Sequence, residues 1–453
     1  MSEKDTIAAI ATPQGAGGVG IIRISGPEVP RISKALIGDL PKPRYAAFRR
    51  FQDEHAESID EGIALYFPRP HSFTGEDVLE LQGHGGPVVL DMVLSRVLQC
   101  GARIAHAGEF SKRAFLNGKL DLVQVEAVAD LIEAGTAQAA RLALRSLEGV
   151  FSKRVHDLLE RLIHLRCWVE AAIDFPDEEI DFLSDGKVEA DTRELIQALG
   201  ATIASARTGR LLRDGIQLVI AGPPNAGKSS LLNALSGRES AIVTDIPGTT
   251  RDLLRERIQI DGIPVHIVDT AGLRHSDDLV EREGIRRARE ELVKADLILW
   301  LIDERDYREH GRSASIEAVP APSSDSLPVI LVRNKIDLVG GRAGLVNAEQ
   351  GNELLISAKN GEGLDLLREL IKSTVGGVGT GEGEFLARRR HLDALNRAMG
   401  HVELGLRQLQ NLASGELLAE ELRLSQQALS EITGEYSADD LLGEIFSGFC
   451  IGK

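Results

Sequence analysis

The residues best able to do chemistry in this chain form a phosphate-binding loop. An apolar segment, Gln217–Ala221, leads into the run GPPNAGKS at 222–229, and Ser230–Leu235 has helical spacing. A strand, a GxxxxGK[ST] loop and a helix in this order turn backbone N–H groups and a helix N-terminus toward phosphate oxygens. Lys228 would reach the β- and γ-phosphates, and the Ser229 hydroxyl would bind Mg²⁺. The sequence therefore predicts a nucleoside triphosphate site.

Three further motifs follow in the order that GTPases require. Strand-like segments end in DTAG at 269–272, in NKID at 334–337 and in SAK at 357–359. The Asp337 carboxylate can accept from N1–H and the 2-amino group of guanine, whereas adenine offers neither donor. The motifs together predict GTP as the nucleotide. The predicted GTP-binding residues in the four motifs are Asn225, Ala226, Gly227, Lys228, Ser229, Ser230, Asp269, Thr270, Ala271, Gly272, Asn334, Lys335, Asp337, Ser357, Ala358 and Lys359.

A candidate switch loop, TDIPGTTRD at 244–252, lies between the phosphate loop and Asp269. A threonine of such a loop completes the Mg²⁺ shell when GTP is bound, and we choose Thr250 over Thr249 as the ligand beside Ser229. A surface turn would have the same composition, so only the position favours a switch. The predicted nucleotide contacts of this loop are Thr244, Asp245, Ile246, Pro247, Gly248, Thr249 and Thr250.

Leu273 stands where Ras-like proteins carry a water-orienting glutamine. A leucine side chain cannot align water, so hydrolysis needs another polarising group. A carboxylate could come from the acidic residues just downstream, and Arg251, Arg274 and Arg282 remain candidates for an arginine finger. Those acidic residues are Asp277, Asp278, Glu281 and Glu283.

Residues 1–119 have the pattern of a mixed α/β domain. Strand-like segments occupy Thr6–Thr12, Val19–Ser25, Ile63–Phe67 and Asp77–Gln82, and Pro87–Leu98 has helical spacing. The turn GAGGVG at 15–20 matches the dinucleotide fingerprint by spacing. That fingerprint needs a helix after its last glycine, and the following residues favour a strand. We therefore reject a dinucleotide site.

Helical patterns flank the predicted GTPase. They run over Leu120–Asp214 and again over Phe385–Ile432, with a glycine-rich linker at 376–383. We predict one discontinuous helical domain, 120–214 and 379–453, with a Ras-like P-loop GTPase domain inserted at 215–378. Insertion costs little when the ends of the guest lie close together. The other interpretation is two separate helical domains.

Composition narrows the class of protein. The chain has 453 residues, a net charge of −17, 43% apolar and 27% charged residues, and no apolar run near the ~20 residues of a membrane span. Its three cysteines, at 100, 167 and 450, have no metal-binding spacing. We expect a cytoplasmic protein with no membrane segment. The negative charge argues against the whole chain being a non-specific nucleic-acid binder.

These residues resemble the MnmE/TrmE-type tRNA-modification GTPases along the whole chain. The resemblance is carried by TIAAIATPQGAGGVGIIRISG at 6–26, HSFTGEDVLELQGHGG at 71–86, GEFSKRAFLNGKLD at 108–121, GTTRD at 248–252 and the terminus CIGK at 450–453. It implies an N-terminal folate-binding and dimerising domain, a discontinuous helical domain and an inserted GTPase. Pro223 departs from the pattern, since many relatives have Arg or Lys there.

The resemblance also implies partners and chemistry. Members form homodimers and work with an FAD-containing protein of the MnmG/GidA type, in a heterotetramer or larger assembly. Together they add a carboxymethylaminomethyl or aminomethyl group to C5 of the wobble uridine of certain tRNAs. The one-carbon unit comes from a tetrahydrofolate derivative, in the 5,10-methylene or 5-formyl form, and GTP hydrolysis is required.

Particular residues match the functional positions of that family. Asn225, Thr244, Ile246 and Thr249 match its K⁺ site, which replaces an arginine finger, and Glu281 matches its water-activating carboxylate. The folate contacts match Arg23, Glu80, Lys119 and Lys453, and Cys450 matches the terminal cysteine. The main alternative is a ribosome-assembly or translation GTPase without modification chemistry. A second alternative is a regulatory GTPase that never meets RNA.

Overall fold

The computed structural model describes residues 5–13, 15–174, 186–236, 255–260, 263–269, 295–317, 327–348, 351–376, 384–412, 414–435, 445–446, 449 and 452. The chain divides into two compact units, one made of residues 1–129, 146–195 and 397–453 and the other of residues 130–145 and 196–396. None of the helices in the described ranges combines the length and apolar character that a membrane crossing demands.

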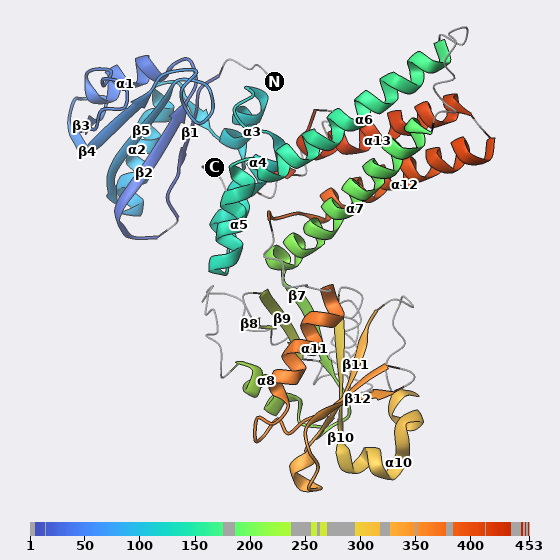
Figure 1. The fold of residues 1–453 in the computed structure, drawn as a ribbon. Coiled ribbons are helices and arrows are strands. Elements are labelled where there is room, and N and C mark those ends of the chain that lie inside the picture. Colours follow the sequence, from blue (N-terminus) through green and yellow to red (C-terminus); the bar gives the residue numbers. More distant parts are fainter. Residues whose placement is uncertain are drawn as a thin grey trace, which may run out of the picture. The chain divides into compact units, whose positions relative to one another are not determined.

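The N-terminal residues form a sheet with strand order β3-β4-β5-β2-β1-β6 (Figure 1). Helices α1 and α2 bury their apolar stripes on one face of this sheet, against Ile22, Leu79 and Leu81. The strands are β1 (Ile7–Ile10), β2 (Gly17–Ser25), β3 (Ala47–Gln52), β4 (Ser58–Phe67), β5 (Val78–Gly85) and β6 (Arg103–Ile104), and the helices are α1 (Val29–Ile37), α2 (Pro87–Gln99) and α3 (Glu109–Leu116). Because α1 and α2 share one face, the side chains of the other face are available for a site or an interface.

Long helices follow, and two of them pack together in the first unit. Helix α6 packs along α13, with Arg166 Nη1 donating to Gln426 Oε1 at 2.6 Å. The helices of this region are α4 (Leu122–Glu133), α5 (Ala137–Leu147), α6 (Val150–Asp174), α7 (Lys187–Asp214), α12 (Arg389–Leu412) and α13 (Gly415–Thr433). The buried side chains of α6 recur every three or four residues, as Phe151, Val155, Leu158 and Leu162 show, so its apolar stripe is what holds it in the bundle.

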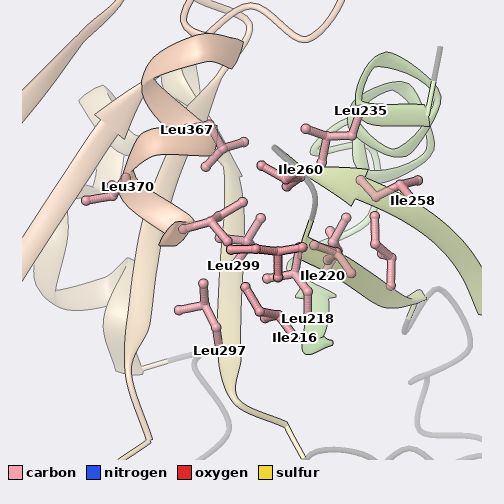
Figure 2. Packing of buried hydrophobic residues seen from close by; sticks show 14 of the residues in the cluster. Ile216, Leu218, Ile220, Leu235, Ile258, Ile260, Leu297, Leu299, Leu367 and Leu370 are labelled. Atoms are coloured by element: carbon pink, nitrogen blue, oxygen red, sulfur yellow. The ribbon is translucent and has the colours of Figure 1, made fainter. Parts of the chain in front are cut away.

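The second unit contains a sheet with strand order β12-β13-β11-β10-β7-β9-β8, in which the inner strands are parallel and the edge strands β8 and β12 antiparallel. Figure 2 shows α8 and α11 packing on one face of this sheet, where Leu367 of α11 joins sheet side chains such as Leu218, Ile220 and Leu299. The elements are β7 (Ile216–Ala221), α8 (Lys228–Ser236), β8 (Arg255–Ile260), β9 (Ile263–Asp269), β10 (Leu297–Asp303), α10 (Glu304–Glu317), β11 (Val329–Asn334), a 3-10 turn (Ile336–Leu338), β12 (Gly344–Ala348), β13 (Gly351–Leu355) and α11 (Leu364–Gly376). Parallel strands carry their loops to one edge, where α/β proteins bind ligands.

Most predicted elements agree with the structure. Two predictions, on the segment after Gly20 and on the start of the helix near Phe385, can be compared with it in detail. The rejection of a dinucleotide fingerprint is confirmed, because the residues after Gly20 continue strand β2. The prediction that the helix at Phe385–Ile432 begins at Phe385 is wrong, since α12 begins at Arg389. Phe385, Leu386 and Ala387 are each at most 3% exposed. Three consecutive buried residues suit an extended, enclosed segment better than a helix with one buried stripe.

Candidate functional site

The phosphate-binding loop has the local structure that the sequence predicts. Strand β7 is buried along most of its length, and α8 begins at Lys228. Gly227 has φ 101°, and a Cβ added there would lie 2.4 Å from Nδ2 of Asn334, so only glycine fits. Lys228 Nζ donates to the carbonyl oxygens of Gly222 at 2.9 Å and Pro223 at 3.0 Å. Asn225, Ser229 and Ser230 are exposed at the loop and the first turn of α8, where an anion is favoured.

The guanine motif lies directly against this loop. Asn334 Nδ2 donates to the Ala226 carbonyl at 2.9 Å, and the backbone N–H of Ala358 donates to Asn334 Oδ1 at the same distance. One amide therefore joins the phosphate loop, the end of β11 and the loop after β13. Ser357 Oγ donates to Asp337 Oδ1 at 2.7 Å, which orients the carboxylate predicted to bind guanine. The structure thus brings the motifs at 222–229, 334–337 and 357–359 together.

Other predicted residues of the site are only partly described. Asp269 ends β9, and its backbone is in register with Ile220, one residue before Ala221 and two before the phosphate loop. Its side chain lies outside the described residues. The same holds for Thr244, Asp245, Ile246, Pro247, Gly248, Thr249, Thr250, Thr270, Ala271, Gly272, Glu281, Cys450 and Lys453.

A second group of charged and aromatic residues lies on the N-terminal sheet. Arg23 on β2 is directly opposite Glu80 on β5, and Arg23 Nε donates to Glu80 Oε1 at 2.9 Å. The guanidinium carbon lies 5.7 Å from the ring centroid of Phe73 and 5.8 Å from that of Phe110. Cation–π contacts and the ion pair hold this arginine in one orientation.

The chain terminus reaches the same arginine. Arg23 Nη1 lies 3.5 Å from the carbonyl oxygen of Gly452. Gly452 has φ 103°, and a Cβ there would come within 2.4 Å of the Ile10 carbonyl, so glycine allows this close approach to β1. Asn117 Nδ2 donates to the carbonyl of Thr74, the residue after Phe73, at 2.7 Å. Lys119, two residues after Asn117, is exposed.

Known protein families match most of this chain. The family described as "MnmE helical domain" matches residues 122–450, and "GTP-binding protein TrmE N-terminus" matches residues 6–119. Two proteins named tRNA modification GTPase MnmE, from Erwinia tasmaniensis and Yersinia pseudotuberculosis, are each 58% identical over all of this chain and all of their own length. The chain belongs to the MnmE family of tRNA modification GTPases.

Membership of the MnmE family confirms the resemblance seen in the sequence, and the predicted combination of α/β and helical domains is confirmed with it. The chain is a GTPase. Among solved structures, Aquifex aeolicus Era bound to GDP and AlF4− is 26% identical and covers 42% of this chain and 67% of that chain, with a TM-score of 0.28. A likeness that weak adds nothing to the assignment.

The motifs did not reveal every residue around the nucleotide site. Asp303 ends β10, which pairs with both β7 and β11, and its carboxylate contacts Lys335. The pattern that marked Asp269 and Asn334, a polar residue after an apolar strand, is also present at 297–303 and could have identified it. No sequence pattern indicated that Phe73 and Phe110 lie near Arg23, since this proximity depends on the tertiary fold.

Proposed function

We propose that this GTPase works with an FAD-containing partner and a tetrahydrofolate one-carbon donor. Together they add a carboxymethylaminomethyl or aminomethyl group to C5 of the wobble uridine of certain tRNAs. Family membership supports the role in tRNA modification. The observation that supports a folate donor is the group of residues around Arg23. None of these residues is needed for GTP binding or hydrolysis, so the group calls for a separate ligand.

The chemistry of folate suits the residues around Arg23. The glutamate tail of folate is anionic and pairs with a guanidinium or an ammonium, which Arg23, Lys119 and Lys453 supply. The Glu80 carboxylate can accept hydrogen bonds from the N–H groups of the pterin. Phe73 is 37% exposed and offers an aromatic face beside them. The carbonyl of Gly452 lies beside Arg23, and Cys450 is two residues earlier in the sequence. This proximity in the chain supports a role for Cys450 in the folate chemistry.

GTP hydrolysis is assigned to the second unit. We propose that Ser229 and Thr250 bind Mg²⁺, and that Asn225, Thr244, Ile246 and Thr249 bind K⁺, which offsets the charge that an arginine finger would offset elsewhere. Glu281 activates the attacking water. Asn225 supports this assignment because it is exposed in the phosphate loop with a left-handed backbone, φ 64°. A non-glycine residue in that conformation is uncommon and often functional.

The assembly is proposed to be a homodimer formed through the N-terminal domain, joined by an MnmG/GidA-type partner in a heterotetramer or larger complex that acts on tRNA in the cytoplasm. The sheet face away from α1 and α2 carries Phe48, 62% exposed, directly opposite Ile63, 38% exposed. Tyr45, just before β3, is 63% exposed. Exposed apolar residues that cluster on one face support an interface there.

Titration of the full-length protein with 5-formyl-tetrahydrofolate tests the folate assignment. Arg23→Ala should weaken folate binding about tenfold or more, since charge-assisted hydrogen bonds are lost, while GTP affinity stays the same. Arg49→Ala is a matched control, because Arg49 pairs with Asp39 on the same domain away from Arg23. A ribosome-assembly or translation GTPase would bind GTP but no folate. Absence of folate binding by the wild-type protein would contradict the proposal.

A further inference from the structure

A buried carboxylate lies beside the nucleotide motifs without belonging to any of them. Asp303 is the last residue of β10, and its side chain is 6% exposed. It is in register with Asn334 on β11, and three residues earlier Trp300 is in register with Ala221 on β7. Asp303 therefore stands between the strand that leads to the phosphate loop and the strand that leads to the guanine motif.

The contacts of Asp303 form a chain that ends in the phosphate loop. Its Oδ2 accepts from Lys335 Nζ at 3.0 Å, and the same ammonium donates to the backbone carbonyl of Asn225. Lys335 and Asn225 both have left-handed backbones, with φ of 66° and 64°. Such conformations are uncommon in non-glycine residues, although asparagine tolerates them better than lysine does. The ammonium thus ties two strained positions to one fixed anion.

Arg305 is the second partner of this carboxylate. Its Nη2 lies 2.7 Å from Oδ2, and its Nε and backbone N lie 3.1 and 2.9 Å from Oδ1. The hydrogen bond from Arg305 holds the pKa of the Asp303 carboxyl well below its usual range, although burial opposes this, and Lys335 adds to the lowering. The carboxylate is therefore charged at neutral pH. Arg305 is 56% exposed and Lys335 26%, so solvent screens the arginine pair more.

We propose that Asp303 is a positioning residue for the nucleotide: it holds the Lys335 ammonium against the Asn225 carbonyl and so sets the shape of the phosphate loop before GTP or GDP binds. A loop that is already in its bound shape loses less entropy on binding. The inference rests on the proposed nucleotide roles of Asn225 and Lys335.

A double-mutant cycle on nucleotide affinity tests the proposal in the full-length protein. Asp303→Asn keeps the shape of the side chain and removes its charge. It should weaken GDP and GTP binding about tenfold and raise KM for GTP. We expect kcat to stay within about threefold, because the hydrolytic step is assigned to Glu281 and the bound cations. In a Lys335→Met background the same change should cost less than twofold, since the ammonium through which it acts is absent.

Arg305→Gln is the matched control. It should change nucleotide affinity less than twofold, and Asp303→Asn should keep its full effect in that background. A full effect of Asp303→Asn with Lys335→Met, or loss of the effect with Arg305→Gln, would overturn the proposal, as would unchanged affinity in the single variant. If Asp303→Asn does not fold, Asp303→Glu, which moves the carboxylate, is measured in the same cycle with the same expectations. Unchanged affinity in Lys335→Met alone would instead contradict the nucleotide role of Lys335.

Discussion

Arg213 and Arg388 donate to the same carboxylate oxygen, Oδ1 of Asp130, at 2.8 and 2.6 Å. Arg213 lies just before β7, where the chain enters the predicted GTPase insertion, and Arg388 lies just before α12, after the chain has left it. Asp130, on α4, is 7% exposed. One side chain therefore accepts hydrogen bonds from both connections of the predicted insertion.

Asp130→Ala should destabilise the GTPase unit. The substitution removes a buried acceptor that both arginines share. Because both arginines are partly exposed and Arg213 keeps its pair with Asp214, we expect a loss of about 2–3 kcal/mol, below the usual range for a fully buried pair. The unfolding transition that GDP shifts upward should fall by about 5 °C or more in calorimetry. Glu431→Ala removes a more exposed ion pair, with Arg397, in the other unit. It should lower the unfolding temperature of that unit much less. Equal effects of the two variants would show that Asp130 has no special role.

Guanine selectivity should depend on Asp337. In Asp337→Asn the carboxylate, which only accepts, becomes an amide whose NH2 group donates. Xanthosine triphosphate, which has a carbonyl at the 2-position, should then compete better than GTP. We expect GTP affinity to fall about 100-fold or more, since the site's polar groups no longer match the base. Competition binding measures this. Asp365→Asn on α11 is the control for an equivalent change of charge, and wild-type selectivity in Asp337→Asn would remove this residue from the base site.

Hydrolysis should depend on K⁺ through Asn225. GTP turnover should rise steeply when K⁺ replaces Na⁺ at equal ionic strength, and Asn225→Ala should abolish that rise while GDP still binds. In the same series, Glu281→Ala should slow hydrolysis by ~10²–10⁴-fold, the usual range for loss of a general base, with nucleotide affinity kept. Equal rates of the wild-type protein in the two salts would exclude a K⁺ site.

The N-terminal domain should lose stability in acid through Glu109. Burial alone would raise the pKa of Glu109, but hydrogen bonds from Arg103, the His106 backbone N–H and Arg113 lower it from 4.5 to about 2. Because the folded pKa is depressed, the stabilisation is present above about pH 4.5 and is lost as the pH falls toward 2.

Glu109→Gln tests this linkage. The variant should lose about 2 kcal/mol at pH 7, less than the full shift would give because Arg103 is partly exposed. Protection of the amide hydrogens of β1 and α3 against exchange should decrease as the pH falls from 5 to 2. In Glu109→Gln this decrease should be smaller than in the wild-type protein. Glu54→Gln, an exposed change in the same domain, should follow the wild type. A Glu109→Gln profile as steep as the wild type would assign the acid sensitivity to other groups.

Sequence patterns predicted the parts of the site that are local in the chain. The loop at 222–229 lies between a strand and a helix whose apolar spacing marks both, so its shape could be foreseen. Contacts between distant segments could not. The pairing of Arg23 with Glu80 depends on the register of β2 and β5, and the proximity of Asp130 to Arg388 depends on how helices pack. The apolar segment that ends in Asp303 gives the same signal as the one that ends in Asp269, but Asp303 belongs to no GTPase motif, and its contacts with Lys335 and Arg305 depend on the fold.

The most direct test of the whole account is the nucleoside content of tRNA from cells that lack this protein. Cells complemented with the wild-type chain should regain the modified wobble uridine in mass spectrometry. Cells with Arg23→Ala or Cys450→Ser should not regain it, although the purified variants should keep GTP turnover within about twofold, because these residues are assigned to the folate chemistry and not to hydrolysis. Full modification with both variants, or none with the wild-type chain, would contradict the account.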